Sequence, residues 1–181
     1  MKAKHKTFGQ TKRLIFRKMN FDDFEEISKM LNQENVKKVW GKKFTNKDVK
    51  KWIENCMGSY TNLGEGFYIM QNRENNDVAG QISLSQDTIE GEIFYEIGYI
   101  LNEKYLSQGY ATEAAKHMSE IAFEFINTDK VIFEIQPTNI KSINVAKRLG
   151  AKETGSFFKN VNGKKLEHKI YTLTNKCKKC R

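Results

Sequence analysis

A glycine turn between a strand-like segment and a helix-like segment constrains this chain more than any other feature. Residues 94–101 (FYEIGYIL) have the composition of a strand, and Gly109 precedes residues 110–126, where apolar side chains recur at helical spacing. A helix that begins after such a turn leaves its first backbone N–H groups unpaired, beside the positive end of the helix dipole. Because glycine has no side chain, an anion can approach these groups closely. The turn is therefore a candidate phosphate site.

The other patterns predict one mixed sheet with helices. Strands are expected at 14–17, 67–70, 78–84, 94–101, 131–135, 157–161 and 166–173, and helices after Asp22 or Asp23, after Thr45, at 110–126 and after Asn139. Turns at 72–77, at 87–91 and at Asn162-Gly163 separate neighbouring strands. The order strand–helix–strand through 94–135 implies a right-handed crossover, and so a parallel pair.

The composition fits a single globular domain. The 181 residues are 39% hydrophobic and 12% aromatic, which is enough for one core. No apolar run approaches the roughly 20 residues that a membrane-spanning helix needs, and residues 1–12 lack the apolar segment of a secretory signal. We therefore expect a cytoplasmic protein with no membrane partner. Residues 13–174 are expected to form the domain, with basic tails at 1–12 and 175–181.

The net charge and the cysteine content limit which kinds of partner the chain is expected to have. The formal net charge of +9 lies largely in the two tails and favours an anionic partner, but no RNA-binding motif is present, so nucleic acid is not expected. Three cysteines are too few for a disulfide scaffold, which indicates a reducing compartment. Cys177 and Cys180 have the spacing of metal ligands. Since a structural zinc ion takes four ligands and no second pair is present, no metal is expected.

Four motifs follow one another along the chain: Glu96-Ile97-Gly98-Tyr99, Gly109-Tyr110-Ala111-Thr112-Glu113-Ala114, Asn139-x-x-Ser142 and Arg148-Leu149-Gly150. In this combination the chain resembles the GNAT superfamily of acetyl-CoA-dependent N-acetyltransferases. Within it, the chain resembles the RimJ/RimL-like branch, which acetylates protein N-termini and small amines. The resemblance runs from about residue 13 to residue 173. It implies an α/β fold with a mixed α+β sheet, in which the parallel strand pair splays apart to admit the pantetheine arm.

The resemblance also implies acetyl-CoA as co-substrate and no metal. The contacts it implies are Ile97, Gly98 and Tyr99 on the strand, Ser107, Gln108, Gly109, Tyr110, Ala111 and Thr112 in the turn, and Asn139 and Ser142 at the later helix. Leu106 and Ser107 replace the basic or glutamine residue and the glycine of the family pattern. Because this turn would bind through backbone N–H groups, the replacements need not abolish binding. Asn139 has two compatible roles, as helix cap and as partner of a pantetheine amide.

Amine acetylation needs a base, a polarised carbonyl and a thiolate that can leave. Glu96 is the first candidate for the base, since partial burial in an apolar strand would raise its pKa; Glu153 or water could serve instead. Ser142 is the first candidate to meet the thioester sulfur, because the tyrosine that many relatives carry on this helix is replaced by Ala146. Cys56 lies on a predicted apolar helix face, so direct attack in a ternary complex is expected rather than a covalent intermediate.

The expected activity is transfer of acetyl from acetyl-CoA to a primary amine, foremost a protein N-terminal α-amine. A small-molecule amine, such as a polyamine or an antibiotic, is the second hypothesis. A non-catalytic CoA- or RNA-binding module on the same fold is the third, since fold and function are separable. The acceptor site is expected between residues 22–57 and 157–167, with Trp40, Trp52, Phe157 and Phe158 as candidate lining residues. A homodimer is left open.

Overall fold

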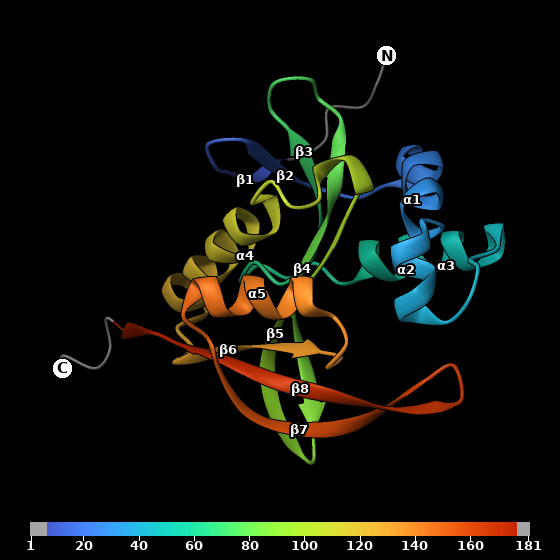
Figure 1. The fold of residues 1–181 in the computed structure, drawn as a ribbon. Helices are drawn as coiled ribbons and strands as arrows, with labels where there is room; N and C mark the ends of the chain where they lie inside the picture. The colour runs from blue at the N-terminus through green and yellow to red at the C-terminus, as the bar shows by residue number, and fades with distance from the viewer. Residues whose placement is uncertain (1–6, 177–181) are drawn as a thin grey trace.

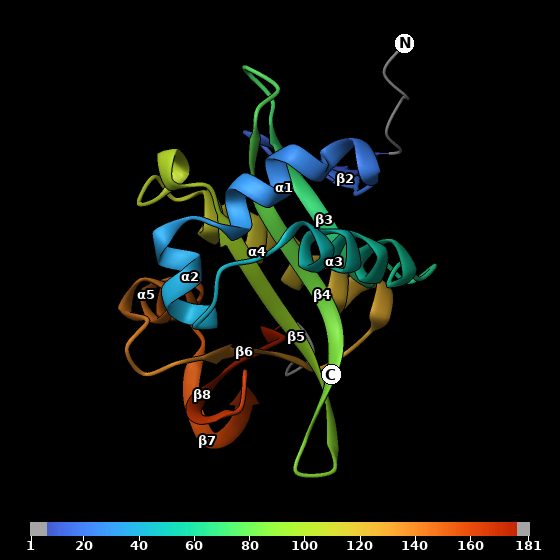
Figure 2. The ribbon, with the colours of Figure 1, turned by 90° about the vertical axis from the view of Figure 1, so that its right-hand side faces the viewer.

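The computed structural model describes residues 7–176, which form a mixed sheet of eight strands with helices on both faces (Figures 1 and 2). The strands are β1 (Thr7–Gln10), β2 (Leu14–Lys18), β3 (Gly66–Asn72), β4 (Val78–Ile89), β5 (Glu92–Leu101), β6 (Lys130–Ile135), β7 (Lys152–Val161) and β8 (Lys164–Thr174). The helices are α1 (Phe24–Leu31), α2 (Glu34–Trp40), α3 (Asn46–Gly58), α4 (Tyr110–Ile121) and α5 (Ile140–Leu149). Cys177 and Cys180, with the outer parts of both predicted tails, lie outside the described residues.

The predicted parallel pair is confirmed and is the least paired junction of the sheet. The strand order is β1-β2-β3-β4-β5-β6-β8-β7. Strands β5 and β6 run parallel and share one register pair, Glu96 with Ile132, whereas β5 pairs with β4 along its whole length. Figure 1 shows β5 and β6 leaving each other at a wide angle. The sheet therefore opens between these two strands, as the predicted splay requires.

Two hydrophobic clusters lie on the two faces of the sheet. Helices α4 and α5 bury one cluster, which includes Ile97, and helices α1 to α3 bury the other, against which Ile100 packs. Figure 2 shows α1, α2 and α3 in front of the sheet and α4 behind it. Since successive strand residues point to opposite faces, Tyr99 shares the α4–α5 face with Ile97, and Glu96 shares the α1–α3 face with Ile100.

Two elements were not expected from the sequence. Strand β1 is a short edge strand that pairs with β2, within the predicted N-terminal tail, and it is too short and too exposed to show an apolar alternation. Helix α2 has seven residues, and the Gln33 side chain makes no capping hydrogen bond to it, so it lacks a sequence signal for its start. None of the described helices is long and apolar enough to cross a membrane.

The turn predicted at 87–91 is wrong in its extent. Strand β4 continues through Asp87 to Ile89, and the chain reverses at Glu90 and Gly91, whose φ angles are 51° and 89°. A two-residue turn with positive φ at both positions matches the twist of an antiparallel hairpin, so the strands extend up to it. The predicted hairpin at Asn162-Gly163 is confirmed, with φ of 49° and 79°. Its first strand begins earlier than predicted, at Lys152.

A buried ion pair connects β2 to the turn that precedes α1. Arg17 Nη2 lies 2.6 Å from Asp23 Oδ1 and Arg17 Nη1 lies 3.0 Å from Asp23 Oδ2, with side-chain exposures of 7% and 6%. We predict that Asp23→Ala lowers the free energy of unfolding by about 3–5 kcal/mol, because the Arg17 charge stays buried without this carboxylate. Glu25→Ala, at an exposed position in α1, is the control and should change stability by less than about 0.5 kcal/mol. Urea unfolding measures both; equal losses would contradict the prediction.

Candidate active site

Three carboxylates from three adjacent strands meet on the face turned toward α1 to α3. Asp87 lies on β4, Glu96 on β5 and Glu134 on β6, and each contributes an oxygen atom within 4.8 Å of the others. Register explains the meeting. Glu96 pairs with Ser85 and Phe94 pairs with Asp87, so Asp87 is the diagonal neighbour of Glu96 on the same face. Glu134 lies two residues beyond Ile132, the partner of Glu96 across the parallel junction, and so points to that face too.

A lysine from the C-terminal hairpin binds two of the three carboxylates. Lys159 Nζ, on β7, lies 2.7 Å from Asp87 Oδ2 and 2.8 Å from Glu134 Oε2. Burial opposes the charge of this ammonium, but the hydrogen bonds with Asp87 and Glu134 outweigh it and raise the pKa of Lys159. The same contact holds the pKa of Asp87 below its ordinary value, although burial acts against this. Lys159 thus bonds to two of the three carboxylates in the cluster.

Glu96 is the member of the cluster whose proton affinity is most changed. Burial, followed by the nearby charge of Glu134, raises the pKa of Glu96 to about 8, while Lys159 acts in the opposite direction. Burial also raises the pKa of Glu134, whose side chain is 3% exposed. A carboxyl group that titrates near neutral pH can take a proton from an amine and release it again, which an ordinary glutamate does poorly. The arrangement therefore suits the role expected of Glu96.

The spacing of the three carboxylates would also fit a divalent cation. Lys159 Nζ already contacts oxygen atoms of Asp87 and Glu134, so a metal ion would have to compete with this ammonium. The expectation that the protein uses no metal stays a prediction.

The predicted phosphate turn has the backbone geometry that the sequence suggested. Gly109 is the N-cap of α4 with φ of 83°, and Ser107 has φ of 60°. A Cβ at position 109 would be strained, and it would stand 3.5 Å from Arg13 Nη2. Thr112 Oγ1, in the first turn of α4, is buried with no hydrogen-bond partner among residues 7–176. Free N–H groups, an uncrowded glycine and an unpartnered hydroxyl together fit a phosphate group.

The sequence analysis did not predict the cationic side chain that lies at this turn. Arg13, just before β2, places its Nε 2.6 Å from Glu113 Oε2 and donates from Nη1 to the Gln108 carbonyl at 2.9 Å. Its guanidinium carbon lies 4.0 Å from the centre of the Tyr110 ring. The turn's own sequence has no basic residue, and Arg13 lies 95 positions before Gln108. No local pattern could have joined them, because the contact depends on β2 lying beside the start of α4.

Tyr99 and Ser142 meet on the opposite face of β5. The Asn139 side chain accepts from Ser142 N at 3.2 Å, which confirms Asn139 as the cap of α5. Burial raises the pKa of Tyr99 to about 12, and a hydrogen bond with the Ser142 side chain acts in the opposite direction. The Tyr99 hydroxyl is buried, and no atom of the described chain makes a hydrogen bond of normal geometry with it. The base candidate and this phenol thus lie on the two sides of one strand.

Of the four aromatic residues expected at the acceptor site, Trp40 and Trp52 pack on each other, while Phe157 lies against His168. The Trp40 and Trp52 rings lie 5.3 Å apart, edge to face, and Trp52 Nε1 donates to Gln81 Oε1 at 2.8 Å. Asn162, at the tip of the β7–β8 hairpin, donates to the Trp40 carbonyl, so the hairpin touches α2 on the side of the sheet that carries Glu96. Phe158 is 61% exposed.

Glu153, the rival of Glu96 as base, and Cys56, the candidate nucleophile of a covalent route, are less suited to chemistry. Glu153 accepts from Lys169 Nζ at 2.8 Å and from the Tyr171 hydroxyl at 3.0 Å, and these bonds hold its pKa below the ordinary value. Cys56 is buried, and burial raises the pKa of its thiol to about 12, which suppresses the thiolate that a nucleophilic route requires.

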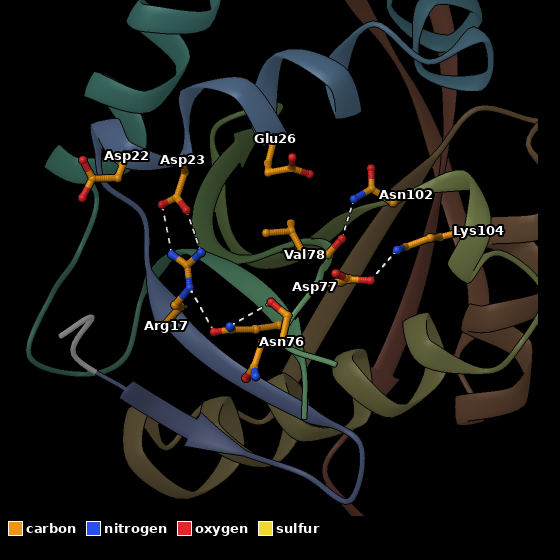
Figure 3. Close-up of a pocket in the computed structure, with 10 residues that line it drawn as sticks. Arg17, Asp22, Asp23, Glu26, Asn76, Asp77, Val78, Asn102 and Lys104 are labelled. Carbon is orange, nitrogen blue, oxygen red and sulfur yellow. Dashed lines mark hydrogen bonds and ion pairs between the residues drawn. The ribbon is translucent and has the colours of Figure 1, made fainter. Parts of the chain in front are cut away.

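A pocket of about 700 Å³ lies elsewhere, where β2, the start of β4 and the segment after β5 come together (Figure 3). Most of its charges are already paired, as in Arg17 with Asp23 and Lys104 with Asp77. None of the predicted catalytic or cofactor-binding residues lines it, although Asp22, Asp23 and Glu26 belong to the segment expected to border the acceptor site.

Comparison with known proteins agrees with this geometry. A family model described as "Acetyltransferase (GNAT) domain" matches residues 13–152. The uncharacterized N-acetyltransferase YnaD of Bacillus subtilis (strain 168) is 33% identical over 150 residues, covering 82% of this chain and 85% of that protein.

Solved structures agree as well. The structure of a GNAT-family acetyltransferase from Bacillus anthracis superposes with a TM-score of 0.77 at 26% identity, over 91% of this chain and 96% of that one. The Microcin C7 self immunity acetyltransferase MccE, solved in complex with acetyl-CoA and AMP, has the same fold, with a TM-score of 0.75 at 17% identity over 91% and 94% of the two chains. With the open β5–β6 junction and the glycine turn before α4, these matches show that the chain belongs to the GNAT acetyltransferase superfamily.

Proposed function

We propose that this enzyme acetylates a protein N-terminal α-amine by direct attack on acetyl-CoA within a ternary complex, with Glu96 as the base. One observation carries the proposal. Glu96 titrates near neutral pH within a carboxylate cluster at the junction where β5 and β6 part. A thioester held between the two strands would bring its carbonyl near this group, which lies on the face that α1 to α3 cover.

The role of each site residue follows from its position relative to acetyl-CoA. The first-turn N–H groups of α4, with Thr112 and the guanidinium of Arg13, bind the pyrophosphate. Ile97, Gly98 and Tyr99 follow Glu96 on β5, beyond the shared register pair, and so border the opened gap. Gly98 matters there because Ser83 Oγ already lies 2.9 Å from the place of a Cβ. Backbone groups in this gap are available to the amides of the pantetheine arm.

The carboxylate cluster receives the amine. An acceptor amine reaches the enzyme largely as ammonium, and a group of carboxylates with one lysine partner binds that cation. Glu96 then takes the proton as the nitrogen attacks the carbonyl carbon. Asp87 and Glu134 stay bonded to Lys159, and their negative charge stays beside Glu96. Positioning of the two substrates supplies much of the rate enhancement, since no covalent intermediate is needed.

The choice of acceptor rests on resemblance. The motifs of the RimJ/RimL-like branch favour a protein N-terminal amine, and their presence here supports this acceptor class. A small-molecule amine is the second candidate, favoured by the fold shared with a self immunity acetyltransferase and by a carboxylate cluster that suits a polyamine. A screen of CoA release over short peptides and small amines, including spermidine, separates the two. Release with polyamines alone would overturn the peptide proposal.

Two further expectations accompany this function. A cytoplasmic location follows from the need for acetyl-CoA and from the small number of cysteines. A homodimer stays a prediction that sedimentation analysis can test.

The phosphate turn gives a prediction on binding. Gly109→Asp should weaken acetyl-CoA binding by about 100-fold or more, because a side chain and a negative charge would face the pyrophosphate and like charges repel at close range. The matched control is Gly91→Asp, which meets the same backbone strain, with φ of 89° against 83°, in an exposed turn with open space around it. Calorimetric titration with acetyl-CoA measures both variants. Equal affinities for the two variants would exclude the turn as the phosphate site.

The carboxylate cluster gives a prediction on rate. Glu96→Gln should lower kcat by about 100- to 10,000-fold, the usual contribution of a positioned base. In the parent enzyme kcat should rise with pH up to about 8, because Glu96 must lose its proton to act, and this rise should vanish in the variant. Comparing both enzymes on one acceptor cancels the titration of the acceptor itself. Glu92→Gln, an exposed glutamate on the same strand and face, is the control. An unchanged pH profile in Glu96→Gln would move the role to Glu153 or to water.

A further inference from the structure

We propose that Lys159 is the positioning residue of the carboxylate cluster, and that its ammonium joins Asp87 on β4 to Glu134 on β6 and so holds these two carboxylates on the two sides of Glu96. The role of Lys159 rests on the proposed function, because Glu96 is the base there. Lys159 acts through the cluster and touches neither substrate. Its effect can be measured on Glu96 directly, and so separately from acetyl transfer.

The first observation is where the ammonium lies relative to the strands. Lys159 Nζ lies 2.7 Å from Asp87 Oδ2 and 2.8 Å from Glu134 Oε2. In the strand order, β4 and β6 are the two neighbours of β5, which carries Glu96. The two ion pairs of Lys159 therefore span the strand of the base candidate.

The second observation is that these ion pairs cross the least paired junction of the sheet. Because β5 and β6 share one register pair, few backbone hydrogen bonds fix strands β1 to β5 relative to strands β6 to β8. Asp87 belongs to the first group of strands and Glu134 to the second. Lys159 thus ties the two groups together on the face that carries Glu96, and it limits how far Asp87 and Glu134 can move apart.

The third observation is that β7 is fixed on both sides of Lys159. Strand β7 is the outermost strand and is separated from β6 by β8, so Lys159 reaches past β8 to the cluster. At the tip of the hairpin, Asn162 donates to the Trp40 carbonyl at the end of α2. Two residues before Lys159, the Phe157 ring lies 5.9 Å from the His168 ring of β8. These contacts hold the strand that presents the ammonium.

Lys159 also acts on Glu96 through its charge. Burial and then Glu134 raise the pKa of Glu96 to about 8, Lys159 acts in the opposite direction, and Asp87 adds to the rise. Burial lowers the pKa of His168, the other titratable group on which Lys159 acts, so this imidazole is neutral near pH 8. Without the ammonium, three carboxylates would face one another, and the pKa of Glu96 would rise further. Lys159 thus keeps Glu96 usable as a base near neutral pH.

The test compares Lys159→Met, which removes the charge but keeps an unbranched side chain, with Lys159→Arg, which keeps the charge. The titration of Glu96 is followed by carbon-13 NMR of protein labelled at its glutamate carboxyl carbons, and Glu96→Gln assigns the signal. In Lys159→Met the midpoint of Glu96 should rise by about 1–2 pH units, the usual effect of losing a nearby opposite charge. In Lys159→Arg most of this rise should be absent.

The matched control is Lys169→Met. It removes a lysine of the same hairpin that also bonds to a carboxylate, Glu153, at 2.8 Å, but outside the cluster. The midpoint of Glu96 should not move in this variant. An equal rise in Lys169→Met and Lys159→Met would reduce the effect to net charge and overturn the proposal.

The rate profile connects the titration to the reaction. On one acceptor, the rise of kcat with pH should move to higher pH in Lys159→Met by the same interval as the Glu96 midpoint. A lower melting temperature with an unmoved midpoint would make Lys159 a structural ion-pair residue only and would overturn the proposal. Lys159→Gln gives the same comparison if Lys159→Met does not fold. If the midpoint moves and the rate profile does not, Glu96 is not the base, so the proposed function fails while the role of Lys159 in the cluster stands.

Discussion

The structure depends on the junction between the parallel strands β5 and β6, which pair at only one position. Strands β5 and β6 share only the register pair of Glu96 with Ile132, in a sheet whose other strands pair along most of their length. Backbone groups need hydrogen-bond partners when they are buried, so strands that diverge leave room for a ligand that supplies partners. The same junction fixes Glu96 on one face and Tyr99 on the other. Under the proposed function, binding and chemistry would both depend on this single break in the ladder.

The charged groups around this junction are three carboxylates and one lysine, which bonds to two of them. Complete pairing would hold every carboxylate at its ordinary acidity or below, as Lys169 does for Glu153. Here one ammonium, Lys159, binds Asp87 and Glu134 and leaves the third carboxylate to burial and like-charge repulsion. Burial is the largest cause of the raised pKa of Glu96, and the charge of Glu134 adds to it while Lys159 opposes it. The pKa of Glu134 is raised as well, mainly by burial, although this carboxylate is bonded to Lys159.

Much of the fold could be predicted from the sequence because its signals are local. The capping box at Thr45, the cap at Asn139, the glycine before α4 and the Asn162-Gly163 turn each act within a few residues, and the structure has all four. The components of the site outside the motifs could not be predicted. Arg13 reaches the phosphate turn, and Asp87, Glu134 and Lys159 reach Glu96, only through tertiary register.

Unpartnered buried polar atoms mark function only where other features agree. The described chain has such atoms at Asn35, Tyr99, Thr112, His117 and Glu134. His117 stacks on Phe16 within the sheet–helix contact, and burial lowers its pKa, so a neutral core histidine explains it. Thr112, Tyr99 and Glu134 instead lie in the first turn of α4, beside the opened gap and within the carboxylate cluster. Under the proposed function, Thr112 would face the phosphates of acetyl-CoA and the cluster around Glu134 would hold the acceptor ammonium.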